Sequence, residues 1–306
     1  MGRNIIIKKI VGLSMFFTFC IAATVFGHGI TNEKTLYDDL EFTKVQEEVV
    51  FMRALGVLSG EDTNVFRPQD QLTMEDVAFF SSRFHGYAGH SDSKETAIDQ
   101  ALENNLVDSL EGNATYADVN HAYFEGKAPV DSPDGELTRE EFVVFMSQFL
   151  SETIDGQTLF EMKDWTEGPT GVIEAIEYEV LVDDDEKEAY KEYTLTIEGE
   201  AILVNDHARI YQGPIDLSAW EGKNVEESWL TETEDGKKQF NILVAEDGQF
   251  SNEEIADTEI EIDETIIPGS TSKSGGFPAI PVIVGALLLI AVIGFVFMRK
   301  RNVQLN

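Results

Sequence analysis

The stretch from Ala54 to Phe80 constrains the fold of this chain more than any other. An apolar helix end stops at Gly60, a polar turn leads into Phe66–Pro68, and Thr73 precedes a second apolar run. Thr73 is a natural N-cap, because its hydroxyl can accept a hydrogen bond from a free amide of the first helical turn. The pattern therefore predicts a helix, a loop held by one aromatic residue and one proline, and a second helix.

This pattern resembles the repeats of the S-layer homology family, which read roughly G-x-x-x-G, F-x-P and T-R-x-E between two helices. We assign the first repeat to residues 31–87, where Tyr37-Asp38-Asp39 resembles the aromatic-x-aspartate opening of the family. The residues that carry the remaining motifs of this repeat are Gly56, Gly60, Phe66, Pro68 and Thr73.

A divergent second repeat is assigned to residues 88–152. Tyr116-Ala117-Asp118 resembles the aromatic-aspartate element, Pro133 lies in the loop, and Thr138-Arg139-Glu140 matches the threonine-arginine motif. Such domains usually have three repeats around a common axis, and two are recognised here. The first repeat has Met74 in place of the motif arginine.

The resemblance implies non-covalent binding of a secondary cell-wall polysaccharide, often one that bears pyruvate ketals. In such repeats the motif arginine holds the ketal carboxylate, because a planar guanidinium matches a carboxylate. Arg139 is the residue to which this role is carried over. The candidate glycan-binding set is Asp38, Asp118, Thr138, Arg139 and Glu140.

The charge of the chain excludes one class of partner. The chain has 57 acidic and 22 basic residues, a net charge of −35. Six of the basic residues lie at the two ends, so the region 27–298 carries 57 acids against 16 bases. Such a surface repels phosphates, and we expect no binding of nucleic acid.

The two ends predict an exported protein with a membrane span. Residues 1–27 read as a signal peptide, in which Arg3, Lys8 and Lys9 precede an apolar segment; an uncleaved N-terminal anchor is the alternative. Residues 279–298 contain no charge and are long enough for a transmembrane helix. Because Arg299-Lys300-Arg301 follows, the tail 299–306 is predicted to be cytoplasmic and the bulk of the chain extracellular, in the cell wall.

Residues 165–247 change to short, partly alternating apolar runs separated by turn signals, which predict a small antiparallel β barrel or sandwich. Trp165, Trp220 and Trp229 fall in or beside this region and are candidates either for a sugar platform or for core packing. Residues 248–277 are acidic and then rich in serine and glycine, as is typical of a linker.

The sequence thus predicts an α+β protein with N-terminal all-helical S-layer-homology-like repeats, a small antiparallel β domain, an acidic linker and one C-terminal transmembrane helix. We expect a non-catalytic surface protein that binds wall polysaccharide or acts as a scaffold, without cofactor or metal. Two alternatives stay open: an enzyme that acts on polysaccharide through paired carboxylates, and a calcium-responsive module. A calcium loop around Gly135 would place Val130 at the first ligand position, where no ligand atom is available from the side chain.

Overall fold

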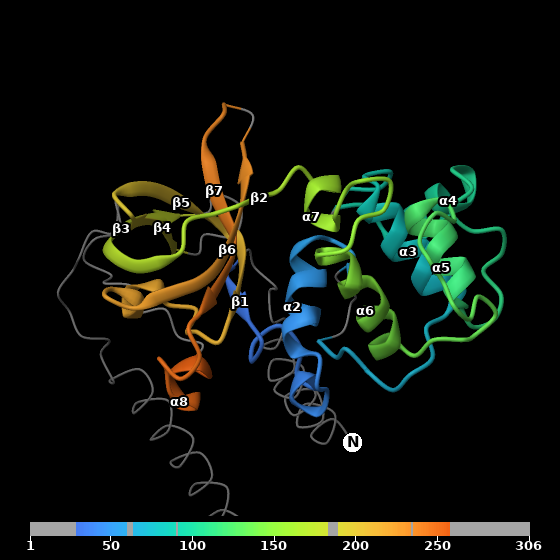
Figure 1. Cartoon of the computed structure of the whole chain (residues 1–306), viewed down its shortest axis with the longest axis horizontal. Coiled ribbons are helices and arrows are strands. Elements are labelled where there is room, and N and C mark those ends of the chain that lie inside the picture. The colour runs from blue at the N-terminus through green and yellow to red at the C-terminus, as the bar shows by residue number, and fades with distance from the viewer. Residues whose placement is uncertain (1–28, 60–63, 90, 183–188, 234, 258–306) are drawn as a thin grey trace, which may run out of the picture. The chain divides into compact units, whose positions relative to one another are not determined.

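The computed structural model describes residues 29–59, 64–89, 91–182, 189–233 and 235–257 (Figure 1). Within these ranges the chain forms seven α-helices: α2 (Gln46–Ala54), α3 (Met74–Phe84), α4 (Lys94–Glu103), α5 (Tyr116–Phe124), α6 (Arg139–Ser147), α7 (Leu159–Met162) and α8 (Asn252–Ile255). The same ranges contain seven strands: β1 (Thr31–Asn32), β2 (Thr166–Glu167), β3 (Gly171–Val182), β4 (Ala189–Ile197), β5 (Glu200–Tyr211), β6 (Asn224–Glu232) and β7 (Lys238–Ala245). Single turns of 3-10 helix, η1 (Leu40–Phe42), η2 (Gln148–Leu150) and η3 (Leu217–Trp220), connect some of them.

Three extended segments meet where α3, α5 and α6 begin. Their threonines, Thr73, Thr115 and Thr138, each cap the following helix through a capping box. A side-chain N-cap of this kind stabilises a helix by about 1 kcal/mol. The threonine and the acidic residue three positions later satisfy each other's free amides, so each segment is held rigidly to its own helix.

Backbone hydrogen bonds join these three segments in a cycle. The amide of Leu72 donates to the carbonyl of Leu137 (2.8 Å), that of Leu137 to Ala114 (3.1 Å), and that of Ala114 to Leu72 (2.8 Å). All three side chains are completely buried. A second set of bonds repeats the three-fold order: Met74 to Gly112, Tyr116 to Gly135 and Arg139 to Asp70. The structure therefore contains three equivalent cap segments, one more than the sequence analysis recognised.

The third cap segment has no helix of its own before it. α2 precedes the first segment and contacts α6, and α4 precedes the second and contacts α3. The structure describes all residues between the end of α5 at Phe124 and the start of α6 at Arg139, and they form a loop without a further helix. This shortened unit explains why residues 88–152 read as one irregular repeat.

Strands β3 to β7 close into a five-stranded barrel. β5 pairs antiparallel with β4, β4 with β3, β3 with β6 and β6 with β7, and β7 completes the circle by pairing in parallel with β5. Numbered along the chain, the order is 1-2-3-5-4-1, which is the connectivity of an OB-fold barrel. Barrels of this type host many unrelated functions, so the fold alone assigns none.

The helices and the barrel share pairing and packing contacts. β1, which precedes all helices, pairs in parallel with β5. Helix α2 contacts both β5 and β7. Ile242 and Val244 of β7 belong to the same buried cluster as the cores of the helices, and Tyr211 and Trp229 pack against it. The predicted fold class, N-terminal all-helical repeats followed by a small antiparallel β barrel or sandwich, is therefore wrong: β1 precedes the helices, and the barrel closes through the parallel pair of β5 and β7.

The fold prediction also included a C-terminal transmembrane helix. No helix among the described residues is both long enough and apolar enough to cross a bilayer. The predicted span 279–298 lies outside the described residues, as do the predicted signal peptide 1–27, the tail 299–306 and residues 258–277 of the linker.

Candidate functional site

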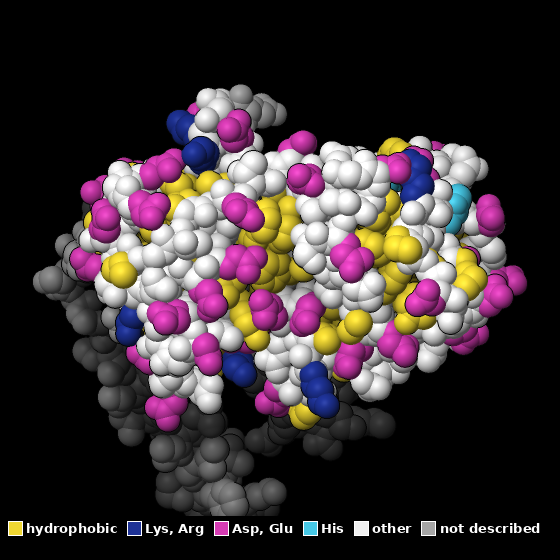
Figure 2. Space-filling view, in the orientation of Figure 1, with side chains coloured by type: hydrophobic (Ala, Val, Ile, Leu, Met, Phe, Trp, Pro, Cys, Tyr) yellow, Lys and Arg dark blue, Asp and Glu magenta, His cyan; other side chains and the backbone are white. Residues whose placement is uncertain are grey.

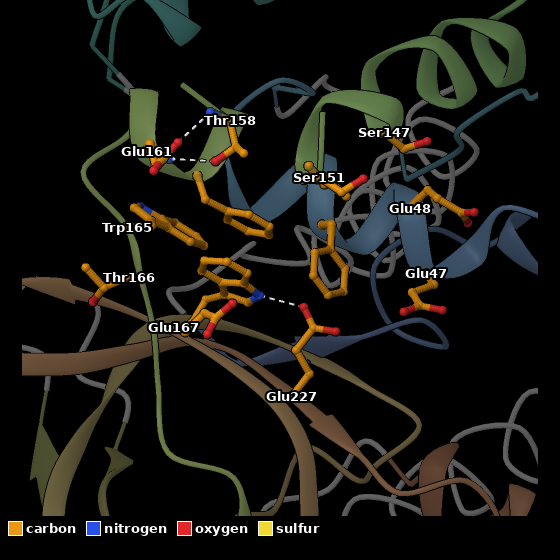
Figure 3. A pocket seen from close by; sticks show the side chains of 14 residues that line it. Glu47, Glu48, Ser147, Ser151, Thr158, Glu161, Trp165, Thr166, Glu167 and Glu227 are labelled. Carbon is orange, nitrogen blue, oxygen red and sulfur yellow. Dashed lines mark hydrogen bonds between the residues drawn. The ribbon is translucent and has the colours of Figure 1, made fainter. Parts of the chain in front are cut away.

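A groove with a volume of 870 Å³ opens where α2, η2 and α7 meet β2 and β6 (Figure 3). Figure 2 shows hydrophobic side chains gathered on the surface here, with acidic side chains beside them. The groove draws residues from both the helices and the sheet, because these pack on one core. Its lining comprises Glu47, Glu48, Phe51, Ser147, Leu150, Ser151, Thr158, Phe160, Glu161, Trp165, Thr166, Glu167, Glu227 and Trp229.

Aromatic rings form one wall of the groove. Phe160 and Trp229 stack almost parallel, with ring centroids 3.4 Å apart and an interplanar angle of 8°. Trp165 continues the stack on Phe160 at 6.2 Å, and Phe51 meets Phe160 edge-on at 6.1 Å. Phe51 and Phe160 are buried, whereas Trp165 and Trp229 are half-buried. The two tryptophans therefore present ring surface to the groove over a rigid aromatic backing.

Local sequence explains why these rings meet. The Thr158 hydroxyl caps α7 through the amide of Glu161, and this cap starts the short helix immediately before Phe160. On β6, side chains alternate between the two faces, so Glu227 and Trp229 share one face. The indole Nε1 of Trp229 donates a 2.6 Å hydrogen bond to Oε1 of Glu227, which fixes the orientation of the ring.

Five carboxylates surround this aromatic wall, and none of the lining residues is Lys, Arg or His. Two of the five are engaged, Glu161 in the α7 capping box and Glu227 with Trp229. The others, Glu47 and Glu48 from the first turn of α2 and Glu167 from β2, accept no hydrogen bond and form no ion pair in the described structure. These three carboxylates are available to a ligand.

The electrostatic field of the groove is negative. Partial burial raises the pKa of Glu47, and the neighbouring charges of Glu48, Glu227 and Glu226 raise it further. Burial likewise raises the pKa of the Tyr211 phenol, with contributions from Glu47, Glu33 and Glu48. A neutral or cationic ligand is therefore favoured over an anionic one.

Arg139, the leading candidate of the sequence analysis, is engaged inside the helical part. Its side chain is only 3% exposed, Nη1 lies 3.5 Å from Oδ2 of Asp76, and Nε donates a 2.6 Å hydrogen bond to the carbonyl of Phe66. The guanidinium also lies over the rings of Phe66 and Phe80, at 5.6 and 5.4 Å. In this conformation Arg139 ties the first cap segment to the third and is not presented to a ligand.

The other four predicted glycan-binding residues lie in the helical part, outside the groove. Thr138 is the N-cap of α6, and Asp118 accepts hydrogen bonds from both the amide and the hydroxyl of Thr115. Glu140 accepts a 2.7 Å hydrogen bond from the Thr43 hydroxyl, and Asp38 is exposed. None of the five predicted residues lines the groove.

The motif residues act in the framework of the helical part. Phe66 is completely buried, and the carbonyls of Pro68 and Pro133 accept hydrogen bonds from the amides of Glu140 and Ala117. Gly56 follows α2 with φ +74°, a conformation that favours glycine. Gly60 lies outside the described residues. The neighbouring Asp39 bonds the amides of Phe66 and Arg67, at 2.6 and 2.7 Å, so the aromatic-x-aspartate opening anchors this loop.

The three tryptophans divide between the two roles considered for them. Trp165 and Trp229 line the groove, and Trp220 is completely buried in the barrel core, where its Nε1 donates to the carbonyl of Pro214 (3.0 Å). Sequence reasoning missed Glu47, Glu48, Phe160 and Glu227. The alternation Glu227-x-Trp229 on one strand face was the available signal, but its partner helices could not be located from the sequence.

Among the described residues, no group of three or more His, Cys, Asp or Glu side chains is arranged to hold a metal ion. In the segment considered as a calcium loop, the Glu141 carboxylate instead accepts hydrogen bonds from the amide and the hydroxyl of Thr138.

Comparison of the chain with family models, with curated proteins and with solved structures found no match.

Proposed function

We propose that this protein is a non-catalytic cell-envelope surface protein that binds wall polysaccharide non-covalently, and that the groove between α2, α7, β2 and β6 is the binding site. The observation that carries the proposal is the combination of two half-buried tryptophans with three unengaged carboxylates in one open groove. By its fold, the protein combines three helix-capping segments, joined by backbone hydrogen bonds, with a closed β barrel.

A sugar fits both chemical properties of this groove. The C–H face of a pyranose ring is apolar and packs on an aromatic ring, whereas its hydroxyl edge consists of hydrogen-bond donors and acceptors. Ionised carboxylates only accept hydrogen bonds, and sugar hydroxyls can supply the donors. The groove is also open to solvent, so it can hold one stretch of a longer polymer.

The cell-envelope location is supported by the helical part. The cycle of Leu72, Ala114 and Leu137 joins three capped segments about one axis, which agrees with the three-fold repeats of the S-layer homology family. The acidic composition is consistent with an exterior, nucleic-acid-free environment. We accordingly propose that the described residues lie on the outer side of the cell membrane, within the wall.

One test is sedimentation of the full chain, in detergent, with purified wall sacculi before and after removal of their secondary polysaccharide. We expect retention on intact sacculi and loss of retention on stripped ones. Absence of retention on intact sacculi would overturn the proposal.

A polysaccharide-acting enzyme is the second candidate, and the raised pKa of Glu47 beside Glu48 and Glu227 favours it. Carboxylates with separated pKa values serve as acid and base in glycoside hydrolysis. Release of new reducing ends from sacculi, abolished by Glu47→Gln, would replace binding by catalysis as the function of the groove.

A further inference from the structure

The groove has an excess of negative charge, which favours a cationic ligand. Glu47, Glu48 and Glu167 have no cationic or hydrogen-bonding partner among the described residues, and the lining contains no basic side chain. Glu48 and Glu227 further raise the pKa of Glu47 by repulsion. A neutral ligand leaves this repulsion in place, and an anionic ligand increases it, whereas a cation removes it.

The aromatic wall adds a second preference for positive charge. Trp165 and Trp229 are half-buried, and their ring surfaces line the same groove as the carboxylates. Tryptophan is the aromatic residue that attracts a cation most strongly, and partial burial increases the attraction. In Figure 3 Glu47 and Glu48 lie toward one end of the groove, and Trp165, Glu161 and Glu167 lie toward the other.

The groove lacks what an acidic sugar requires. A ketal carboxylate is bound by guanidinium or ammonium donors. Arg139 is the residue to which the family resemblance assigns that role, but it is engaged with Asp76 and Phe66 and does not line the groove.

Resting on the proposed function, we infer that the glycan bound in this groove carries a free, protonated amine, as a de-N-acetylated amino sugar does. The ammonium group lies beside Glu47 and Glu48, and an apolar face of the glycan packs on Trp229 or Trp165 of the same groove. Acetylation of the amine removes both the charge and the ion pairs, so the N-acetylated sugar binds more weakly.

The experiment is titration calorimetry of the full chain in neutral detergent micelles at pH 6 and low salt. The probes are two hexasaccharides of equal length, one of glucosamine and one of N-acetylglucosamine. We expect the glucosamine hexamer to bind at least about tenfold more tightly, and added salt to reduce the difference because it screens the partly exposed carboxylates.

Two variants locate the interaction. Glu47→Gln with Glu48→Gln retains the shape of the groove and removes two carboxylates, and we expect it to abolish most of the preference for glucosamine. Glu95→Gln with Asp99→Asn removes the same amount of charge from the exposed face of α4, away from the groove, and serves as the matched control. An equal loss of preference in both variants would show a general charge effect and overturn the inference.

The outcomes separate this inference from the proposed function. Equal affinity for both hexamers, or no binding of either, overturns the amine assignment even if the protein is retained on sacculi. Preferential binding of glucosamine without retention on sacculi supports the amine assignment and overturns the role in wall binding. Retention on sacculi that falls after chemical N-acetylation of the wall supports both.

Discussion

Individual side chains in this protein are used differently from what their motifs suggest. Arg139 occupies the motif position whose arginine holds a carboxylate of the glycan in the S-layer homology family. Here its guanidinium donates to the carbonyl of Phe66 and pairs with Asp76, both of the first cap segment. The guanidinium that would bind a ligand carboxylate in that family lies here beside an internal carboxylate, with Nη1 3.5 Å from Oδ2 of Asp76.

Replacement of Arg139 by alanine should therefore reduce stability. Because the side chain is 3% exposed, the variant leaves the carbonyl of Phe66 without its guanidinium donor and Asp76 without its ion-pair partner. We expect a loss of about 3 kcal/mol in urea unfolding. Lys44→Ala, at an exposed position, is the control. If Arg139→Ala kept its stability and lost wall retention, Arg139 would be a ligand-binding residue.

Glu33 gives a prediction about pH. Its side chain is buried beside β5, and this burial raises its pKa, although the amides of Glu33 and Gln212 and the charge of Lys34 act in the opposite direction. A raised pKa means that the folded state holds the proton more tightly than the unfolded state. The resulting stabilisation is present below the ordinary pKa of 4.5 and is lost as the pH rises through the raised value.

Glu33→Gln cannot titrate at this position, so it should lack that dependence. We therefore subtract the urea midpoint of the wild type from that of the variant at each pH. We expect this difference to be larger at pH 7 than at pH 4.5. A difference that is the same at both pH values would contradict the raised pKa.

At the scale of elements, local patterns located much of the secondary structure. The helix predicted after the N-cap Thr73 corresponds to α3, and the β region predicted for residues 165–247 contains β3 to β7. The polar pair Asn205-Asp206, which is typical of a turn, lies inside the single strand β5. The pairing of β5 with β7 is irregular between Val204 and Arg209, so the polar pair marks an irregularity and not a turn.

The three-fold cycle was the element that sequence reasoning did not find. Thr115-x-x-Asp118 repeats the capping box of Thr73-x-x-Asp76 and of Thr138-x-x-Glu141, and this was a usable signal. Tyr116-Ala117-Asp118 was assigned to another motif, which hid it. The closure of β7 on β5 and the packing of α2 on the barrel depend on contacts between distant residues, which no local pattern specifies.

Gly213 tests the placement of η3 on the barrel. A β-carbon at this position would overlap the Trp220 ring, which is completely buried. We expect Gly213→Ala to displace the indole and to cost about 1–3 kcal/mol, measured by thermal or urea unfolding. Gly89→Ala, where the nearest atom would be 3.5 Å away, is the matched control. Equal stability of the two variants would show that Trp220 does not pack under this turn.

At the scale of the whole molecule, the helices and the barrel share buried residues. Val244 and Ile242 of β7 belong to the buried cluster formed by the helices. Strand β1, which precedes the first helix in the chain, pairs with β5 of the barrel. We therefore expect one cooperative unfolding transition, in which helical circular dichroism and tryptophan fluorescence coincide. Trp165, Trp220 and Trp229 all report on the barrel or its junction with α7. Two separated transitions would indicate independent domains.

The central claim is that the groove at this junction, and not the motif arginine, holds the wall polysaccharide. The most direct measurement is the fraction of full chain retained on intact sacculi for Trp165→Ala, which removes exposed ring surface from the groove. The control is Tyr87→Ala, which removes a ring that is 46% exposed and does not line the groove. The account predicts at least about a tenfold loss of affinity for Trp165→Ala and none for Tyr87→Ala. Undiminished retention of a folded Trp165→Ala variant would contradict it.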